Sequence, residues 1–328
     1  MRAAWFEKFG AAADVLQVGE LDTPVAGPGE VLVRLYSSGV NPSDVKKRAG
    51  SFPNLLDDGL VIPNSDGAGI IEAVGDGVAA SRVGERVWVY QAQFARRFGT
   101  AAEYVALDSA RAAHLPDSAG FDVGACLGIP AMTAHRCVFA DGNVGDQTIV
   151  ITGAAGRVGY YAVQWASQAG ATVIATASNA EDASSCKAAG AAHVVNHRSD
   201  SIADDILAAN GGARVDRAID LEFGANLATW IAVVKTSGTI ATYGSVAVPE
   251  PTLPFFQLMY MDMNIRFIIV YAMPETAKQQ AIADINIALA NDALDHRIAA
   301  TFPLPEIAAA NELVEKGTIR GAVILNIE

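Results

Sequence analysis

The fold is decided by the stretch Thr148-Ile149-Val150-Ile151-Thr152-Gly153-Ala154-Ala155-Gly156-Arg157-Val158-Gly159. Its first five residues are apolar or β-branched and predict a strand, and the residues that follow the stretch predict an amphipathic helix. Small residues at a strand-to-helix turn let a pyrophosphate approach the backbone N–H groups and the positive end of the helix dipole. The stretch therefore predicts a dinucleotide-binding turn, in which the cofactor contacts Gly153, Ala155, Gly156, Arg157 and Val158.

The glycine spacing is G-x-x-G-x-x-G rather than the more familiar G-x-G-x-x-G, so a plain tight turn is the alternative interpretation. A second predicted strand, residues 172–177, favours cofactor binding. NAD-preferring folds end that strand with an acidic residue that accepts from the ribose 2′-OH, and here the position holds Ser178. A carboxylate repels a 2′-phosphate and a hydroxyl does not, so the sequence predicts NADPH. Ser178 and Glu181 also have the spacing of a capping box, which is the preferred interpretation of Glu181.

The rest of the chain predicts two domains of an α/β protein. Short apolar runs separated by glycine, at residues 31–36, 68–74, 86–90 and 103–107, predict a small β-barrel or sandwich. From residue 116 onward, apolar strands at residues 148–152, 172–177, 193–196, 215–220 and 239–243 alternate with helical stretches, as in a parallel sheet. The final strand, residues 323–327, is expected to return to the first domain. The predicted division is 1–120 with 293–328, and 121–292.

Composition excludes several classes of protein. The 328 residues include 23 Lys and Arg against 36 Asp and Glu, a net charge of −13, with no basic cluster to bind nucleic acid or an anionic membrane. A hydrophobic share of 51% is too high for a disordered chain. Cys126, Cys137 and Cys186 are widely spaced, which disfavours a disulfide framework and favours a reducing, cytoplasmic setting. The charged N-terminus does not resemble an export signal.

Several segments together resemble one family, and they occur in that family's order. The segments are residues 39–44 (GVNPSD), 63–69 (PNSDGAG), 99–104 (GTAAEY), 128–134 (GIPAMTA), the glycine turn, and 196–198 (NHR). They resemble the zeta-crystallin-like quinone oxidoreductases, a zinc-free branch of the medium-chain dehydrogenase/reductases. The resemblance implies a GroES-like β-barrel domain completed by the C-terminal tail, plus a Rossmann domain with a doubly wound parallel sheet, with NADPH in a cleft at the domain junction.

The resemblance also implies roles for individual residues. Asn41 is expected beside the nicotinamide and the substrate as the catalytic residue, although a turn residue before Pro42 is the alternative. Thr133 is expected near the nicotinamide, or else as a helix residue without a ligand. His197 is expected to contact the adenine. Tyr243, Gly244 and Ser245 are expected to form a segment that closes over the cofactor. Phe52 is expected to shape the substrate pocket.

Three features of the sequence depart from relatives. Zinc-using relatives carry a Cys and a His-Glu pair where this chain has Asn41, Ser65 and Asp66, a set that cannot rebuild soft Zn²⁺ ligation, so no metal is predicted. Phe52 stands where the family often has Tyr. Asp182 and the Gly321-Ala322 pair stand where many relatives have Lys and Gly-Lys.

These observations predict an NADPH-dependent oxidoreductase that transfers hydride or electrons to a quinone without a metal. The alternative enzyme is an NADPH-dependent reductase of C=C bonds conjugated to a carbonyl, such as enones or acrylates. Arg96 and Arg97 could then select an acidic substrate, although a solvated loop is the simpler interpretation. A non-catalytic crystallin-like or RNA-binding role is disfavoured by the intact glycine turn and by the negative charge.

A strongly apolar segment, residues 264–272, predicts a strand at the edge of the parallel sheet. An edge of this kind exposes backbone N–H and C=O groups that soluble proteins usually cover. Pairing with a second copy across a two-fold axis would cover it, so the sequence predicts a homodimer, as the resemblance also implies. The alternative is that a loop such as residues 246–263 caps the edge.

Overall fold

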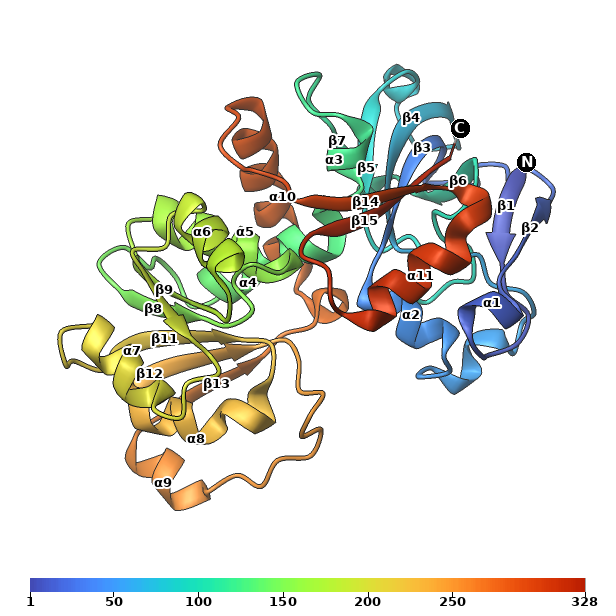
Figure 1. Ribbon diagram of the computed structural model, residues 1–328. Helices are drawn as coiled ribbons and strands as arrows, with labels where there is room; N and C mark the ends of the chain where they lie inside the picture. Colours follow the sequence, from blue (N-terminus) through green and yellow to red (C-terminus); the bar gives the residue numbers. More distant parts are fainter. Residues whose placement is uncertain (328) are drawn as a thin grey trace. The chain divides into compact units, whose positions relative to one another are not determined.

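A computed structural model describes residues 1–327, and the chain divides into two compact units (Figure 1). The first unit contains residues 1–129 together with the chain from residue 282 onward. The second unit contains residues 130–281. The mixed α/β class is therefore confirmed, with strands dominating the first unit and alternating strands and helices forming the second.

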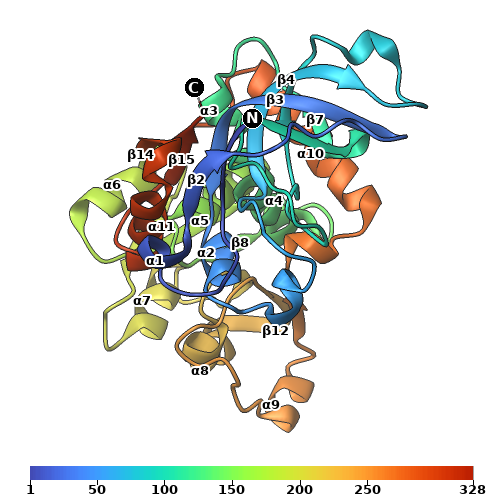
Figure 2. The ribbon, with the colours of Figure 1, turned by 90° about the vertical axis from the view of Figure 1, so that its right-hand side faces the viewer.

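The first unit is built on a seven-stranded sheet with the long strand β3 (Glu30–Val40) at its centre. One edge of β3 pairs antiparallel with β4 (Asp66–Val74), and Figure 2 shows these two strands side by side. The other edge pairs first with β6 (Tyr104–Asp108) and then with β15 (Ala322–Asn326), so the C-terminal strand belongs to the sheet of this unit. The remaining strands are β5 (Arg86–Val89), β7 (Ala112–His114), β14 (Ile298–Pro303) and the separate pair β1 (Arg2–Trp5) and β2 (Gln17–Glu20).

The core of the first unit follows the two-residue period of its strands. In β3, Val31, Val33 and Leu35 are buried while Arg34 between them is exposed, because successive side chains point to opposite faces. Helix α11 (Ile307–Lys316) adds Ile307 and further apolar side chains to the same cluster. The short helices of this unit are α1 (Ala12–Val15), α2 (Pro42–Arg48) and α3 (Phe121–Gly124).

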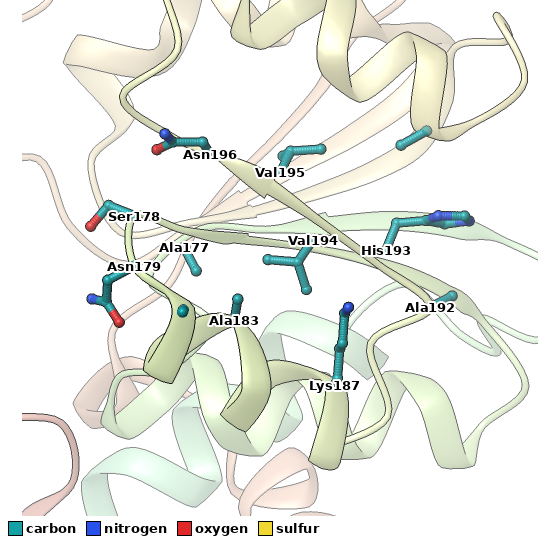
Figure 3. A pocket seen from close by; sticks show the side chains of 12 residues that line it. Ala177, Ser178, Asn179, Ala183, Lys187, Ala192, His193, Val194, Val195 and Asn196 are labelled. Carbon is teal, nitrogen blue, oxygen red and sulfur yellow. The ribbon is translucent and has the colours of Figure 1, made fainter.

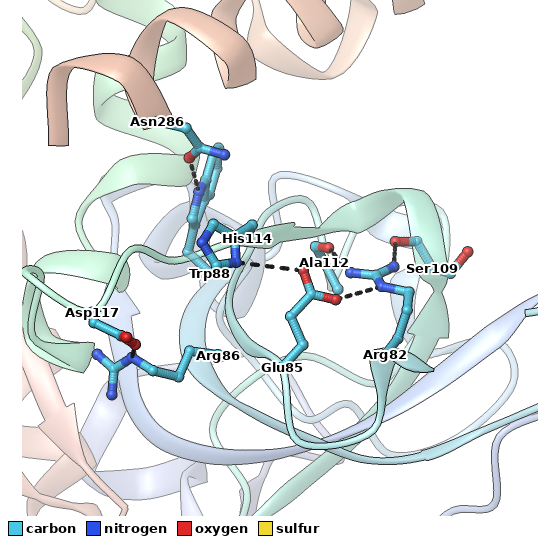
Figure 4. Close-up of polar contacts among 9 residues, drawn as sticks. All are labelled: Arg82, Glu85, Arg86, Trp88, Ser109, Ala112, His114, Asp117 and Asn286. Carbon is cyan, nitrogen blue, oxygen red and sulfur yellow. Dashed lines mark hydrogen bonds and ion pairs between the residues drawn. The ribbon is translucent and has the colours of Figure 1, made fainter. Parts of the chain in front are cut away.

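Polar contacts connect the segments around β5 and β7 with each other and with a helix near the C-terminus (Figure 4). Arg82 pairs with Glu85 at 2.6 Å, and Glu85 also faces the His114 Nδ1 at 3.6 Å. The buried Trp88 donates from Nε1 to the Oδ1 of Asn286 in helix α10 (Glu275–Ala290) at 3.0 Å. Such a bond satisfies the one polar group of a buried indole, and it ties the last residues of α10 to the first unit.

The second unit is a six-stranded, all-parallel sheet in the order β10-β9-β8-β11-β12-β13. Strand order reverses direction between β8 and β11, so this is the doubly wound arrangement with a switch point at that position. The strands are β8 (Thr148–Ile151), β9 (Thr172–Ala177), β10 (His193–Asn196), β11 (Val215–Asp220), β12 (Val234–Thr242) and β13 (Asn264–Phe267). The helices are α4 (Met132–Phe139), α5 (Arg157–Gln168), α6 (Ala180–Ala188), α7 (Ile202–Ala209), α8 (Phe223–Val233) and α9 (Phe255–Tyr260).

The last strand is shorter than the sequence predicted. β13 ends at Phe267, and residues 270–272 form a 3₁₀ turn in which Val270 and Tyr271 are buried. The backbone N–H of Ile268 donates to the Thr242 carbonyl of β12 at 2.8 Å. The prediction of a continuous strand over 264–272 is therefore wrong, because the chain turns after Phe267 and buries Val270 and Tyr271 in a 3₁₀ turn.

Among residues 1–327, even the longest helix, the 16-residue α10, is too short and too polar to cross a membrane. None of the three cysteines forms a disulfide, and all three are buried.

Candidate functional site

The glycine turn joins β8 to α5 at the switch point of the parallel sheet. Gly153 has φ of +56°, a left-handed conformation that glycine adopts without strain. Gly156 is the N-cap of α5, and no side chain caps this helix. The N-terminus of a twelve-residue helix therefore presents its backbone and its positive dipole end rather than a side chain, which is the requirement for binding a pyrophosphate.

The glycines of the turn leave little room for side chains, least of all at Gly159. A Cβ on Gly159 would overlap the carbonyl oxygen of Gly153 and lie 2.8 Å from the Cα of Ala154, both of which are backbone atoms. A Cβ on Gly153 would overlap the side chain of Leu221, which follows β11. The turn is therefore a cradle built from backbone, and its residues fit a dinucleotide cofactor.

A buried carboxylate next to this turn holds the surrounding elements together by hydrogen bonds. Asp220, the last residue of β11, accepts from Thr152 Oγ1 at 2.7 Å, from Asn226 Nδ2 at 2.9 Å and from the indole Nε1 of Trp230 at 2.8 Å. These bonds fasten the ends of β8 and β11 to helix α8. Sequence reasoning missed Asp220, although a lone acidic residue that closes an apolar parallel strand is a usable signal for such a support.

A cavity of about 560 Å³ lies along β9, β10 and α6 (Figure 3). Ser178 and Asn179 follow the end of β9, and Figure 3 shows them at the same end of the cavity as Asn196, the last residue of β10. Lys187 and His193 line the cavity farther along. The carboxyl end of the second strand is where a Rossmann fold places the adenosine ribose, so the position of Ser178 suits a contact with the ribose or its 2′-phosphate.

The helix cap beside this cavity lies one residue later than the sequence predicted. Asn179 is the N-cap of α6: its Oδ1 accepts from the backbone N–H of Asp182 at 2.8 Å, and its Nδ2 donates to the Asp182 carboxylate at 2.8 Å. The predicted pairing of Ser178 with Glu181 is therefore wrong. The shift explains why Asp182 is buried where many relatives have Lys, and it leaves Ser178 outside the cap.

The predicted closing segment, Tyr243, Gly244 and Ser245, follows β12 and lines a second cavity of about 420 Å³, whose other walls include Phe223 and Phe267. Ser245 Oγ accepts from Gly224 N–H at 2.9 Å and donates to the Val248 carbonyl at 2.5 Å, so it holds the loop against helix α8. Burial raises the pKa of the Tyr243 phenol well above 10, so this group stays protonated.

In the first unit, Asn41 lies in a buried cluster of polar side chains. It is the N-cap of α2, with Pro42 in the first turn, and only 4% of it is exposed. Its backbone N–H donates to Asp44 Oδ2 at 2.8 Å, and its amide Nδ2 donates to Asp66 Oδ2 at 2.7 Å. The backbone N–H of Ile129 donates to the same Asp66 oxygen at 2.8 Å. Asn41 is thus both the N-cap of α2 and a donor to a buried carboxyl.

The charges in this cluster perturb one another. Burial raises the pKa of the Asp66 carboxyl to about 8; the Asp44 carboxylate adds to the rise, and the Ile129 and Asn41 hydrogen bonds oppose it. Burial lowers the pKa of the Lys47 ammonium group, against the attraction of Asp44 and Asp66. Lys47 Nζ donates to the Gln93 carbonyl at 2.8 Å and to Ser65 Oγ at 3.4 Å.

The remaining predicted residues are placed as follows. Thr133 is a buried residue of α4, His197 is exposed just after β10, and Phe52 is 45% exposed before a 3₁₀ turn. Arg96 donates to the Ala106 carbonyl, and Arg97 stacks on Phe98 with 4.9 Å to the ring centroid. Local contacts therefore engage both arginines. The roles of Thr133, His197 and Phe52 stay predictions.

No group of three or more His, Cys, Asp or Glu side chains in residues 1–327 is arranged to hold a metal ion. Asn41, Ser65 and Asp66, which stand where zinc-using relatives keep ligands, are engaged in the hydrogen bonds described above. The absence of a bound metal stays a prediction.

The unit with the seven-stranded sheet and the doubly wound unit with its glycine turn are the two domains of a medium-chain dehydrogenase/reductase. Two family models agree: "Alcohol dehydrogenase GroES-like domain" matches residues 27–117, and "Zinc-binding dehydrogenase" matches residues 158–286. Within this class, the chain belongs to the quinone oxidoreductase family, which confirms the resemblance of the sequence segments.

Three relatives illustrate the match. The chain is 28% identical to human quinone oxidoreductase over 321 residues, which cover 97% of this chain and 95% of the human protein. It is 31% identical to the mouse quinone oxidoreductase over 250 residues, or 74% and 73% of the two chains. A mycobacterial protein solved in complex with NADPH superimposes with a TM-score of 0.88 at 26% identity, covering 99% of this chain and all of that one.

Proposed function

We propose that the chain is an NADPH-dependent oxidoreductase that reduces quinones. The observation that carries the proposal is the backbone cradle at Gly153, Gly156 and Gly159 in a chain of the quinone oxidoreductase family. The human and mouse relatives are named for quinone reduction, and the mycobacterial neighbour was solved with NADPH.

NADPH, when bound, supplies a hydride, which together with one proton from water converts a quinone to a hydroquinone. The chain contributes binding and orientation. The N-terminus of α5 would hold the pyrophosphate, Ser178 the 2′-phosphate and His197 the adenine. Tyr243, Gly244 and Ser245 would cover the cofactor, and Thr133 would lie near the nicotinamide.

Asn41 donates its second amide N–H to the acceptor oxygen, on which negative charge develops as hydride arrives. Its first amide N–H is already committed to Asp66 at 2.7 Å, so the amide plane has a fixed orientation. Phe52 supplies an apolar, partly exposed ring to the acceptor pocket.

The direct test is a panel of quinones, enones and acrylates, each mixed with the purified protein and NADPH while the nicotinamide absorbance is followed. Rapid oxidation of NADPH by quinones, with slower or no oxidation by enones, supports quinone reduction. Oxidation by enones alone would assign the chain to the alternative reaction. The absence of turnover with every acceptor, despite NADPH binding, would reject an oxidoreductase role.

We infer that the protein is a cytoplasmic homodimer. Supporting the dimer, β13 is the edge strand of the parallel sheet, and apolar side chains on β13 and on the preceding helix α9 are exposed. The most exposed are Phe267 at 69% and, on α9, Phe255, Phe256 and Tyr260 at 67%, 69% and 81%. A patch of this kind marks a protein interface. Three free, buried thiols support a reducing compartment.

A further inference from the structure

Asp66 is the residue whose environment the proposed function leaves unexplained. It begins β4, none of it is exposed, and its two oxygens have unequal surroundings. Oδ2 accepts two hydrogen bonds, one from Asn41 and one from Ile129. Oδ1 is buried and has no hydrogen-bond partner. Buried polar atoms are rarely left unsatisfied, and an ionised oxygen would be especially costly there.

Gly128 explains why Oδ1 has no partner. A Cβ on Gly128 would overlap Asp66 Oδ1 and lie 2.7 Å from its Cγ, so the carboxyl group fills the space that the missing side chain leaves. The Cα of a glycine neither donates a strong hydrogen bond nor carries charge. The second oxygen of Asp66 is therefore held in an environment that favours a neutral carboxylic acid over a carboxylate.

The charge balance of the cluster points the same way. The charged side chains that face Asp66 are Asp44 and Lys47 of α2, while the 127–131 segment contributes only backbone. A single ammonium group therefore accompanies two carboxyl groups. Asp44 receives the Asn41 backbone N–H and lies 3.5 Å from Ser65 Oγ, which in turn receives Lys47 Nζ, so Asp44 is the better stabilised anion.

We propose that Asp66 is a positioning residue that acts through Asn41: as a neutral acid it fixes the Asn41 amide toward the acceptor oxygen, and as an anion it opposes the negative charge that develops on that oxygen. This inference rests on the proposed function, because it assumes that Asn41 donates to the acceptor. Reduction should therefore slow as Asp66 loses its proton.

The pKa of about 8 for the Asp66 carboxyl sets the pH window. An unperturbed Asp has a pKa of about 3.9. The folded chain thus holds this proton more tightly than the unfolded chain, and the stability linked to Asp66 declines as pH rises from about 4 to about 8. Activity should decline at the upper end of the same window.

The variant D66N tests this because an amide has the shape of the acid but does not ionise. We measure kcat/KM for a quinone with NADPH from pH 6 to pH 10, and normalise each variant to its own value at pH 6. The wild-type value should fall at least about tenfold with a midpoint near pH 8, whereas that of D66N should fall less than about twofold. D58N, at an exposed aspartate of the same unit, is the matched control and should follow the wild type.

Two further measurements keep the test decisive. The thermal midpoint of the wild type should fall relative to that of D66N between pH 6 and pH 9. N41S keeps a capping side chain but has no amide. If Asp66 acts through Asn41, kcat/KM of N41S should fall much less than that of the wild type between pH 6 and pH 10. This variant also tests the inference if D66N does not fold. NADPH affinity, followed by fluorescence, should not depend on Asp66.

A decline that persists unchanged in D66N or in N41S would overturn the inference, as would a flat wild-type profile. The failure of the proposed function looks different, because then the wild type oxidises no NADPH with any quinone at any pH.

Discussion

The glycine turn and the Asn41 cluster solve the problem of positioning a ligand in opposite ways. The turn has no side chains at its glycines, and at Gly159 the backbone is so close that a single methyl group would overlap it. The cluster works by burying side chains, with Asn41, Asp44 and Asp66 held by hydrogen bonds of 2.7 to 2.8 Å. The turn should therefore respond to added volume and be indifferent to pH, whereas the cluster should respond to changes of charge and hydrogen bonding.

The largest effect is expected from adding one methyl group to the turn in G159A. The new Cβ meets backbone atoms of Gly153 and Ala154, which cannot move aside without opening the turn. NADPH binding should weaken about 100-fold or more, equivalent to about 2.7 kcal/mol. Fluorescence titration measures this, and Q168A at the other end of the same helix is the control. Unchanged affinity in G159A would show that the cofactor does not use this turn.

The cluster should respond in turnover rather than in cofactor affinity. In N41S the amide donor is lost while a helix-capping side chain remains, so kcat/KM for a quinone should fall about 100-fold with little change in thermal stability. NADPH affinity should stay within about twofold of the wild-type value, because the cofactor phosphates bind elsewhere. K46A, an exposed residue on the same helix, is the control. A loss of NADPH binding equal to the loss of turnover would refute the separation of the two regions.

Ser178, which lines the larger of the two cavities described above, is predicted to decide between NADPH and NADH through its side chain. S178D should weaken NADPH binding about 10- to 100-fold and strengthen NADH binding, because a carboxylate repels the 2′-phosphate and accepts from the 2′-OH. The variant S184D adds the same charge on the exposed face of α6 and should leave the order of affinities unchanged. Equal affinity of the unaltered protein for NADH and NADPH would show that Ser178 does not select NADPH.

Dimer formation should be separable from both regions. The Ile268 N–H is used within the chain, so a proline there would damage the fold, and the exposed Phe267 is the better target. F267D should weaken association about tenfold or more, because a two-fold interface would bring both new charges into an apolar patch. Sedimentation should show the wild type at twice 34.1 kDa and F267D shifted toward the monomer, with V25D as the control at an exposed residue of the first unit. A wild type that sediments as a monomer at micromolar concentration would reject the dimer.

No effect is expected from removing metal. Elemental analysis should find no stoichiometric zinc, and treatment with a chelator should leave turnover unchanged, because an amide, a hydroxyl and one carboxyl cannot replace soft zinc ligands. Activity lost to the chelator and restored by zinc would reassign the Asn41 cluster as a metal centre.

The two regions also differ in how far the sequence predicts them. The turn is contiguous, so spacing alone predicts the strand, the glycines and the helix. Asn41 was found through resemblance, but its bond to Asp66 joins residues 25 positions apart and exists only because β3 pairs with β4. The cap of α6 was misplaced by one residue because Ser178 and Asn179 are both good caps, and only the backbone decides between them. β13 was predicted too long because a buried turn and a strand can have the same apolar composition.

The burial of every thiol has a consequence for a protein that meets quinones. Quinones are electrophiles that arylate thiolates, and the thiolate is the reactive form of cysteine. Cys126, Cys137 and Cys186 are at most 3% exposed, and burial raises the pKa of Cys137 to about 12, which keeps that thiol protonated. A quinone reductase of this composition would present no accessible thiol to the acceptors that it reduces, so it would work in a flux of reactive quinones without being inactivated at its cysteines.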